Sequence, residues 1–405
     1  MNVILAAIPL FFILIAIEFV VDRRRNTGFY RLNDAIASLT LGIVSRLVDI
    51  VKRLIPFTVY YVVFDSISLL ELPSSPIVWV IAFVVYDFFY YWLHRFSHEI
   101  NVLWAAHVVH HSSEDYNLTT ALRQTSGSVV SWIFFLPMAV AGVPPEMFIS
   151  IGALNLVYQF WVHTQHIDRL GWMEYVFITP SNHRVHHAQN DKYIDCNYGG
   201  VFILWDRMFG TFVDEDKNEP VVYGVRVAFN SWDPVFINLK VYRQLIIDAW
   251  HAKRWQDKLS IWFRPTGWRP DDVARKYPLQ KTDLENFEKF ESQRPPHFAG
   301  YVLFQHVCLI VLTLAFMLGF SALDAPVILL TGGLLLVFAV ANCLILAGVD
   351  YVSTSEVAKH CLLLTSLYLL PMPNYLRVVL VVIASISMIW LLVIHSKQQT
   401  SQQQV

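Results

Sequence analysis

Residues 76–99 read PIVWVIAFVVYDFFYYWLHRFSHE, an apolar run that ends in two histidines. A helix needs about 20 mostly apolar residues to cross the hydrocarbon core of a bilayer. Residues 76–97 meet this requirement and predict a membrane-spanning helix. His94 and His98 lie at its end with the spacing i, i+4, which places both imidazoles on one helix face. This stretch therefore predicts a helical membrane fold with a histidine site at one end of a span.

The composition of the chain also favours a membrane protein. Hydrophobic residues make up 55% of the 405 residues, charged residues make up 15%, and the mean hydropathy is +0.45. Soluble domains carry about 25% charged residues. A formal net charge of −2, with no large basic patch, argues against a nucleic-acid partner. The 4 cysteines are scattered without a CxxC pair, which predicts neither a disulfide framework nor a thiolate metal site.

Further apolar runs predict an all-α, polytopic membrane fold. The candidate spans are residues 3–21, part or all of 36–70, 76–97, 126–143, 146–165, 299–322, 325–347, 355–371 and 374–395. Charged residues interrupt the run 36–70, and 126–143 is short, so both are also consistent with helices that only enter the bilayer. We predict three parts: N-terminal spans in residues 1–75, a catalytic region of spans and a cytoplasmic part in 76–297, and C-terminal spans with a tail in 298–405.

The basic residues predict the orientation of these spans. Arg23, Arg24, Arg25 and Arg31 follow the first span, so we expect that side to be cytoplasmic. Alternation then leaves the loops near 71–75, 143–145, 323–324 and 371–373 outside, and these loops contain no Lys or Arg. The histidine-bearing ends of 76–97 and 146–165 face the cytoplasm in this topology. We therefore expect a cytoplasm-facing site in an integral, multi-pass protein.

The polar stretch 181–297 contains one amphipathic segment. Residues 235–263 read VFINLKVYRQLIIDAWHAKRWQDKLSIWF, which predicts a helix lying against the rest of the protein or the membrane surface.

Ten of the 15 histidines fall within residues 94–187, in four clusters. The clusters are His94 and His98; His107, His110 and His111; His163 and His166; and His183, His186 and His187. Neutral imidazoles with such helical spacing can converge on a metal. Chance or a solvated turn can explain one cluster, but four clusters near one membrane face predict a shared metal site. The other five histidines stand alone, and we interpret them as structural.

The number of histidines bears on the number and kind of metals. One metal takes roughly four to six ligands, so ten imidazoles predict two metals. Ligand type alone leaves iron, zinc, manganese and copper open, although the lack of nearby Cys disfavours structural zinc and iron–sulfur clusters. A hydrolytic zinc ordinarily uses about three protein ligands. Two histidine-bound irons at a membrane surface indicate instead the activation of dioxygen for reaction with a lipid.

Three clusters carry a resemblance to a known family. HRFSH (94–98), HVVHH (107–111) and HRVHH (183–187) resemble the HX3H, HX2HH and HX2HH boxes of the fatty acid hydroxylase / sterol desaturase superfamily. The segments YQFWVHT, TPSNHRVHHAQN, IDCNYGGV and WDRMFGTF are similar to its ether-lipid-cleaving branch, the alkylglycerol monooxygenases, and to bacterial members of that kind. The resemblance covers most of the chain. It implies an enzyme of a bacterial inner membrane whose active site faces the cytoplasm.

The resemblance also implies a cofactor and a reaction. It implies a non-haem di-iron centre, with O2 as co-substrate, that hydroxylates a C–H bond of a lipid substrate and cleaves the ether bond of alkylglycerols. Electrons would come from tetrahydrobiopterin or from a separate electron-donor protein. The catalytic residues carried over are His94, His98, His107, His110, His111, His163, His183, His186 and His187, and His166 joins them as a metal ligand. Gln165 stands where the ether-lipid branch has Glu, which leaves substrate and pterin dependence open.

Three residues outside the boxes are candidates for orienting the ligands. Asp87 lies two helical turns before His94 inside an apolar span, where ionisable residues are functional candidates. Asp195 and Asn197 lie in IDCNYGG. Arg123 and Arg184 are interpreted as ordinary positive-inside residues.

Two other functions remain open. One is a di-iron hydroxylase or desaturase of a sterol, carotenoid or fatty acyl chain. The other is a histidine-rich metal-binding or transport protein, which is disfavoured because the histidines gather at one face and do not line the spans from side to side.

Overall fold

The computed structural model describes residues 3–52, 54–127, 130–292, 297–347, 352–369 and 374–402. Helices dominate these residues, and no β-strand forms among them; the extended pairings there are three isolated bridges. This confirms the predicted all-α fold. The chain divides into two compact units, Met1–Phe229 with Phe236–Lys289, and Asn230–Val235 with Phe290–Val405.

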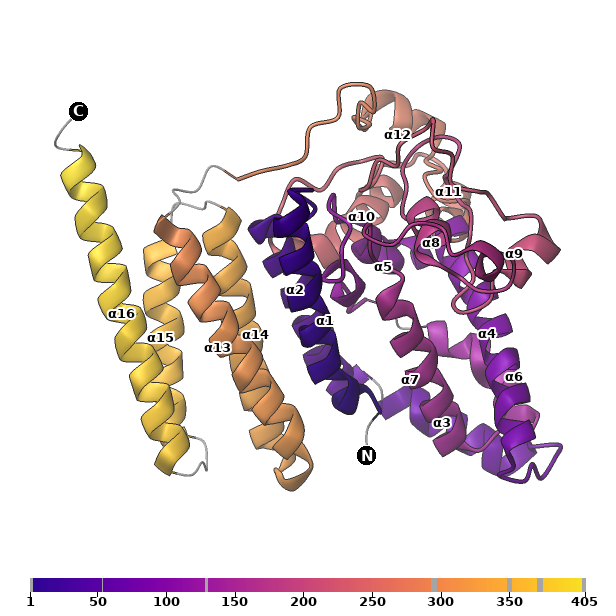
Figure 1. The fold of residues 1–405 in the computed structure, drawn as a ribbon, viewed down its shortest axis with the longest axis horizontal. Coiled ribbons are helices and arrows are strands. Elements are labelled where there is room, and N and C mark those ends of the chain that lie inside the picture. The colour runs from indigo at the N-terminus through magenta and orange to yellow at the C-terminus, as the bar shows by residue number, and fades with distance from the viewer. Residues whose placement is uncertain are drawn as a thin grey trace. The chain divides into compact units, whose positions relative to one another are not determined.

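The first unit combines several long helices with most of the short ones (Figure 1). Its long helices are α1 (Val3–Arg25), α2 (Leu32–Lys52), α3 (Leu54–Ile67), α4 (Pro76–Glu99), α5 (Asn101–His111), α7 (Pro145–Trp161) and α10 (Pro234–His251). Its short ones are η1 (Thr120–Leu122), η2 (Ser131–Phe135), α6 (Leu136–Val140), η3 (Gly171–Tyr175), α8 (Pro180–His186), α9 (Leu204–Phe209), α11 (Trp255–Ser260), η4 (Ile261–Phe263) and α12 (Asp271–Lys276). The second unit consists of α13 (His297–Gly319), η5 (Phe320–Ala322), α14 (Ala325–Ala347), α15 (Val352–Leu369) and α16 (Asn374–Gln402).

Five helices of the described residues are long and apolar enough to cross a membrane. They are Val3–Arg25, Pro76–Glu99, Phe298–Gly319, Ala325–Ala347 and Arg377–Ile394. The chain is thus a multi-pass helical membrane protein, as predicted.

The other four predicted spans form shorter or less apolar helices. The run 36–70 forms α2 and α3, and the described part of 126–143 breaks into η2 and α6. The run 146–165 forms α7, whose 17 residues fall short of a typical span. The described part of 355–371 lies in α15, which carries Glu356 and Lys359 and is not among the five.

A rigid corner joins α4 to α5. Ser75 caps the start of α4 through its hydroxyl, which accepts from the Val78 N–H, and Pro76 occupies the first turn. The helix ends at Glu99, and Ile100 is extended with φ −122° and ψ 125°. The next residue, Asn101, is buried and donates to the backbone carbonyls of Ile261 and Trp268. The corner therefore holds two histidine boxes in a fixed relation.

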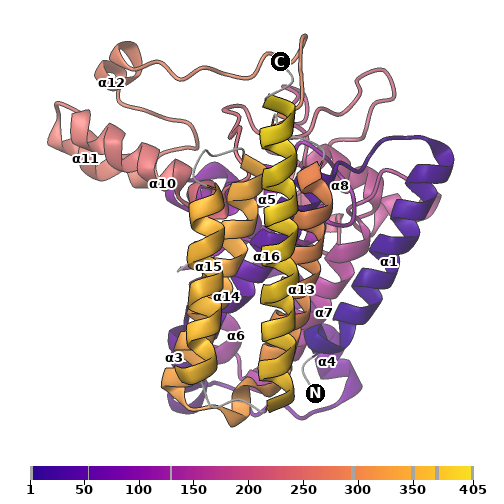
Figure 2. The same cartoon turned by 90° about the vertical axis from the view of Figure 1, so that its left-hand side faces the viewer.

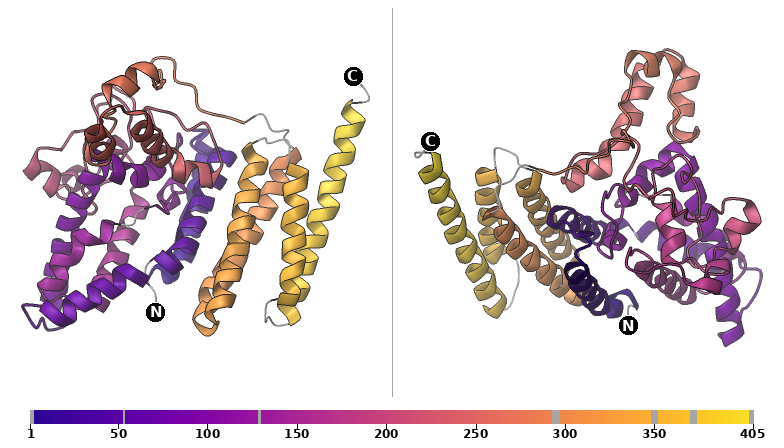
Figure 3. Two further views of the ribbon diagram at one scale, coloured as in Figure 1. Left: turned by 180° about the vertical axis from the view of Figure 1, so that it is seen from behind. Right: turned by 45° about the horizontal axis from the view of Figure 1, so that its top comes forward.

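Several short helices of the first unit gather at one end of its upright helices. Helix α7 contacts both α1 and α4. Figures 1 and 3 show α5, α8 and α9 near the upper ends of α4 and α7. The histidine clusters lie on α4, α5 and α8 and just after α7, so this end of the first unit holds the candidate site.

Candidate metal centre

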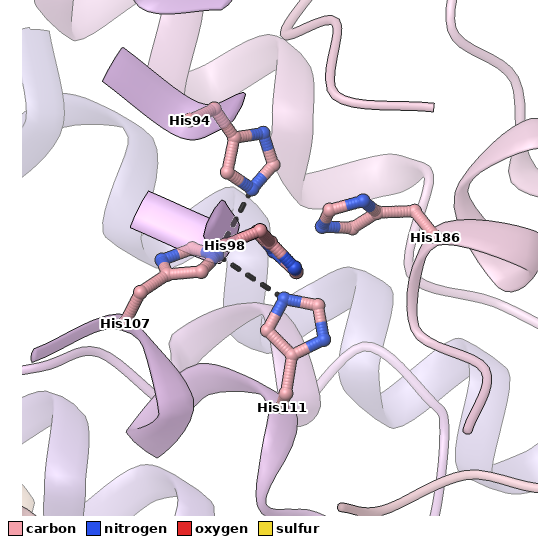
Figure 4. Close-up of side chains that lie close together, drawn as sticks. All are labelled: His94, His98, His107, His111 and His186. Atoms are coloured by element: carbon pink, nitrogen blue, oxygen red, sulfur yellow. Dashed lines mark hydrogen bonds between the residues drawn. The ribbon is translucent and has the colours of Figure 1, made fainter. Parts of the chain in front are cut away.

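Nine of the ten predicted histidines form two groups of converging side chains. The first group is His94, His98, His107, His111 and His186, and the second group is His110, His163, His183 and His187. Within each group, one ring nitrogen per residue lies within 4.8 Å of those of the others. Figure 4 shows the rings of the first group directed toward one another. Each group thus surrounds a small space with nitrogen ligands.

The nitrogens of the first group have the spacing of ligands on one cation. Nε2 of His107 lies 2.9 Å from Nε2 of His94 and 3.1 Å from Nε2 of His111. Two imidazoles bound at right angles, each about 2.1 Å from a metal, place their nitrogens about 3 Å apart. The observed separations match such an arrangement.

The second group has the same spacing and adjoins the first. Nε2 of His163 lies 3.2 Å from Nε2 of His110 and 3.1 Å from Nε2 of His183. The ring of His187 stacks on that of His111 in the first group, with centroids 4.3 Å apart. The two groups therefore form neighbouring sites that contact each other through the stacked rings of His111 and His187.

Helix geometry explains why each HX2HH box serves both groups. On an α-helix, residues i and i+4 point in nearly the same direction, whereas residue i+3 is turned away from residue i by about 60°. In the box on α5, His107 and His111 face the first group and His110 faces the second. In the box on α8 the roles are reversed, because His183 and His187 face the second group and His186 faces the first.

Backbone carbonyls fix the orientation of four rings. The Nδ1–H groups of His94, His110, His163 and His186 donate to the carbonyl oxygens of Tyr198 (2.7 Å), Arg123 (3.1 Å), Gln159 (2.8 Å) and Cys196 (3.0 Å), respectively. This bond leaves the Nε2 lone pair of each ring free to bind a metal.

Unpaired nitrogens also fit a metal. The Nε2 atoms of His98, His186 and His187 are buried and have no hydrogen-bond partner among the residues that the structure describes. Leaving a buried polar atom without a partner is costly. A cation bound by these lone pairs removes that cost, so the residues present fit a metal in each group.

Burial keeps the histidines in the form that binds metals. It lowers the pKa of His110 from the usual 6.5 to about 4. It also lowers the pKa values of His111, His183 and His187 well below 6.5. Metals bind the neutral imidazole. Both groups are therefore ready to bind a cation at neutral pH without first losing protons.

His166, the tenth predicted ligand, lies in neither group. Its ring packs on Phe29, with centroids 5.1 Å apart. The spacing between His163 and His166 predicts one shared face only if the helix continues. Helix α7 ends at Trp161, so the chain turns and His166 points elsewhere. We therefore leave His166 out of the proposed ligand set.

Asp87 is buried near the site but bonds to no histidine. Its carboxylate accepts hydrogen bonds from Asn155 Nδ2 (2.8 Å), Val201 N (2.8 Å), Phe202 N (3.0 Å) and Trp205 Nε1 (3.0 Å). These bonds hold residues 201–205 against α4, close to the Tyr198 carbonyl that orients His94. Gly200 allows this contact, because a Cβ there would lie 2.8 Å from Asp87 Oδ1. Asp87 thus acts on His94 through a backbone segment.

Asp195 and Asn197 lie in one tight turn, with φ values of 59° and 56°. Asp195 Oδ1 lies 3.6 Å from Nδ1 of His98, so it faces a histidine of the first group. The Asn197 side chain donates to the carbonyls of Asn182 and Val213 and accepts from the Val213 N–H. Asn197 therefore supports the backbone of the site and does not contact a ring.

The motifs do not identify Glu18, yet it ties the first helix to the site. This buried carboxylate on α1 accepts from the Leu118 N–H at 2.8 Å and from the hydroxyls of Tyr30 and Thr164. Thr164 directly follows His163. The signal for Glu18 in the sequence is a carboxylate inside an apolar span.

Two tyrosines beside the groups were also not identified. The ring of Tyr198 lies 5.3 Å from that of His98, and its buried hydroxyl has no hydrogen-bond partner in the described part of the chain. Tyr116 stacks on His163 at 5.6 Å and on Tyr223 at 4.7 Å. Aromatic residues inside a helical core carry no distinctive spacing, so only the fold places them here.

Both candidate arginines are held by protein partners. Arg123 is buried, with Nη1 3.6 Å from Asp34 Oδ1 and 3.1 Å from the Ser38 hydroxyl. Arg184 forms a two-pronged pair with Glu215 at 2.8 and 2.7 Å. These contacts agree with structural roles for both.

Comparison with known proteins places this helical membrane protein and its paired histidine groups in a family. The Fatty acid hydroxylase family profile matches residues 79–211. Alkylglycerol monooxygenase of Danio rerio is 38% identical over 341 residues, covering 82% of this chain and 74% of that protein. The chain belongs to the fatty acid hydroxylase family.

Two further alkylglycerol monooxygenases are similar. The Xenopus tropicalis protein is 40% identical over 294 residues, covering 72% of this chain and 65% of that protein. The human protein is 42% identical over 269 residues, covering 65% of this chain and 59% of that protein. The chain thus spans less than two thirds of the length of these two relatives. No solved structure matches it.

Proposed function

We propose that the chain is a membrane-bound, non-haem di-iron monooxygenase that hydroxylates a C–H bond of a lipid. Two adjoining groups of neutral imidazoles, each with nitrogens about 3 Å apart, carry this proposal. Membership of the fatty acid hydroxylase family supports iron and a lipid substrate. The name of these three relatives supports alkylglycerols as that lipid, with cleavage of their ether bond.

Each histidine group would hold one iron. His94, His98, His107, His111 and His186 would bind the first, and His110, His163, His183 and His187 would bind the second. The irons, when bound, supply the activation of O2. The protein supplies neutral ligands, fixes their tautomers through backbone carbonyls and keeps water out by burial. We propose that Asp87, Asp195 and Asn197 hold this arrangement in place.

The substrate proposal has a chemical consequence. Hydroxylation of the carbon beside an ether oxygen gives a hemiacetal, which collapses to an aldehyde and an alcohol. One observation favours a second candidate, the hydroxylation or desaturation of a sterol, carotenoid or fatty acyl chain. Gln165 replaces the Glu of the ether-lipid branch, and its amide donates to the Tyr116 carbonyl at 2.8 Å. The Gln165 side chain therefore stabilises a loop but supplies no carboxylate.

The site lies in a chain with membrane-spanning helices, which bears on its orientation and on how the lipid reaches it. We propose that the catalytic region is 76–297, flanked by membrane parts 1–75 and 298–405, and that the site faces the cytoplasm of a bacterial inner membrane. The basic residues after the first span support this orientation. The lipid would enter sideways from the bilayer. Electrons would come from tetrahydrobiopterin or a separate donor protein.

Lipid analysis tests the proposed reaction. Cells that produce the full-length protein should lose alkylglycerol ether lipids and gain the aldehyde only when oxygen is present, and cells with His186→Ala should not. Oxygen-dependent products from another lipid class would favour the second candidate. Bound metal without any oxygen-dependent lipid change would contradict the enzyme and favour a metal-binding or transport protein.

A further inference from the structure

Helix α10 exposes an apolar outer face. The exposed positions of this helix before its last residue are Val235, Phe236, Leu239, Arg243, Ile246 and Trp250, and all but Arg243 are apolar. They recur at helical spacing and form one stripe. The opposite face is buried, with Ile237 packed on Leu41 and Leu245 on Ala105. A helix that faces water carries a polar outer stripe. From Leu239 to Trp250 this stripe is exposed among the described residues, and an apolar environment would stabilise it.

The exposed apolar surface continues past α10. In α11 and η4 the side chains of Trp255 and Phe263 are 75% and 76% exposed, close to the 80% of Trp250. Leu259 is exposed between them. The anchor segment, as we name residues 234–264, thus presents large apolar side chains along three consecutive elements. An exposed patch of this extent marks an interaction site.

Basic residues outnumber acidic ones in the same segment. The anchor segment contains Lys240, Arg243, Lys253, Arg254, Lys258 and Arg264 but only two acidic residues, Asp248 and Asp257. Asp248 is already neutralised by Arg269 at 2.6 Å. The surface is therefore cationic and aromatic together, a combination typical of segments that bind anionic lipid headgroups.

The anchor segment is fixed to the end of a membrane span. The Asn101 N–H donates to the Arg264 carbonyl at 3.0 Å, and the Thr266 N–H donates to the Glu99 carbonyl at 3.1 Å. Glu99 is the last residue of α4, so this junction lies where that span leaves the bilayer. Figure 2 shows α10 and α11 extending sideways on the side of the first unit away from α1, and the right-hand view of Figure 3 shows them standing out from the first unit.

We infer that the anchor segment lies in the plane of the membrane surface and inserts its aromatic stripe into a leaflet that contains anionic lipids. Trp residues concentrate at the boundary between hydrocarbon and water, and basic side chains beside them reach the headgroups. The attachment at the end of α4 favours a bilayer over a protein partner, because it places the stripe at the level of the headgroups. This inference does not depend on the reaction proposed above.

Spin labels can test the depth of the stripe in the full-length protein. The four native cysteines are replaced by alanine, and the variant is used only if its metal content is unchanged. A nitroxide is then attached at Trp250→Cys or Ile246→Cys, with Arg275→Cys on α12 as an exposed control outside the anchor segment. The protein is reconstituted in nanodiscs of phosphatidylcholine, with or without phosphatidylserine.

We expect labels at 250 and 246 to collide more with oxygen, which concentrates in lipid, than with a water-soluble nickel chelate, and the label at 275 to do the reverse. Phosphatidylserine should increase this contrast. A label at 250 as accessible to nickel as the one at 275 would overturn the inference. Protection from both reagents would also overturn it, because a second copy of the chain or a donor protein would then cover the stripe. Equal depth in both lipid mixtures would overturn the preference for anionic lipid.

Discussion

At the scale of single residues, the two histidine groups separate ligands from bystanders. His183 contributes a ring nitrogen 3.1 Å from that of His163, whereas His166 packs on Phe29 outside both groups. Removing His183 should therefore empty the second group of metal and leave the first group largely filled. We expect His183→Ala to bind about half the metal of the wild type, since each group would hold one cation.

The matched control is His166→Ala, which removes the same side chain from a position outside both groups. Metal analysis of both purified variants should show full content for His166→Ala. Full metal content in His183→Ala, or a loss in His166→Ala as large as in His183→Ala, would show that the ligand set is wrong.

Glu18 supports a second prediction at this scale. Its carboxylate accepts from one backbone N–H, of Leu118, and from two hydroxyls. In Glu18→Gln the amide oxygen can serve Leu118, and the NH2 can donate to a hydroxyl, so we expect little change. In Glu18→Leu the buried N–H loses its partner, which should cost about 1–3 kcal/mol of stability. Thermal unfolding of the two variants in one detergent measures the difference, and equal unfolding temperatures would refute this role.

Sequence spacing predicts nine of the ten histidines as members of one region, because i, i+3 and i+4 positions share a face while a helix lasts. The spacing does not predict the position of His166, because the spacing does not show that α7 ends at Trp161. It also fails for Glu18, Tyr198 and Tyr116. These residues reach the site through tertiary packing between segments far apart in the chain.

At the scale of elements, Asp87 joins helix α4 to the segment that follows the last histidine box. All four groups that donate to Asp87 are N–H groups. They belong to the Asn155 side chain, to the backbone of Val201 and Phe202 and to the Trp205 indole, and the last three have no atom there that could accept a hydrogen bond instead. Asp87→Asn would direct an NH2 group at such donors. We expect the segment to shift, His94 to lose its carbonyl partner and metal affinity to fall about 10–100-fold.

Competition with a chelator of known affinity measures this change. Asp271→Asn serves as a control, because it makes the same change at an exposed carboxylate on α12, outside both histidine groups. Unchanged affinity in Asp87→Asn would show that the link from α4 to His94 has no role in metal binding.

The sequence predicts some of the membrane-spanning helices better than others. The apolar runs 3–21, 76–97, 299–322, 325–347 and 374–395 correspond to the five helices able to span a membrane. The other runs do not: the described part of 126–143 forms the short helices η2 and α6, with Pro137 in the first turn of α6, and α15 contains Glu356 and Lys359. Apolar content alone cannot predict which hydrogen-bond partners the polar groups at such positions find, because those partners come from other helices.

At the scale of the whole molecule, nine buried or half-buried imidazoles make folding depend on pH. In the unfolded chain these groups have a pKa near 6.5, whereas burial lowers that of His110 to about 4 in the fold. Between these values the unfolded chain binds protons that the folded chain does not. The stability contributed by neutral burial is therefore complete above pH 6.5 and is lost as the pH falls toward 4.

We expect the metal-free protein to unfold at a clearly lower temperature at about pH 5 than at about pH 7.5. Bound metal should raise the unfolding temperature at both pH values, because it stabilises the folded state. Calorimetry or fluorescence-detected unfolding of both forms provides the measurement. The same unfolding temperature at both pH values in the metal-free form would contradict the burial of neutral histidines.

Two irons that respond to oxygen are the central prediction for this protein. The iron content, measured together with the redox response of the iron, tests this prediction directly. The full-length protein is purified without oxygen, its metals are quantified, and its absorption and electron paramagnetic resonance spectra are recorded before and after reduction and exposure to O2. We predict about two irons per chain, one per histidine group, and a change in both spectra when O2 is added to the reduced protein. A single zinc per chain, or iron whose spectra do not respond to reduction and O2, would contradict the proposed di-iron monooxygenase.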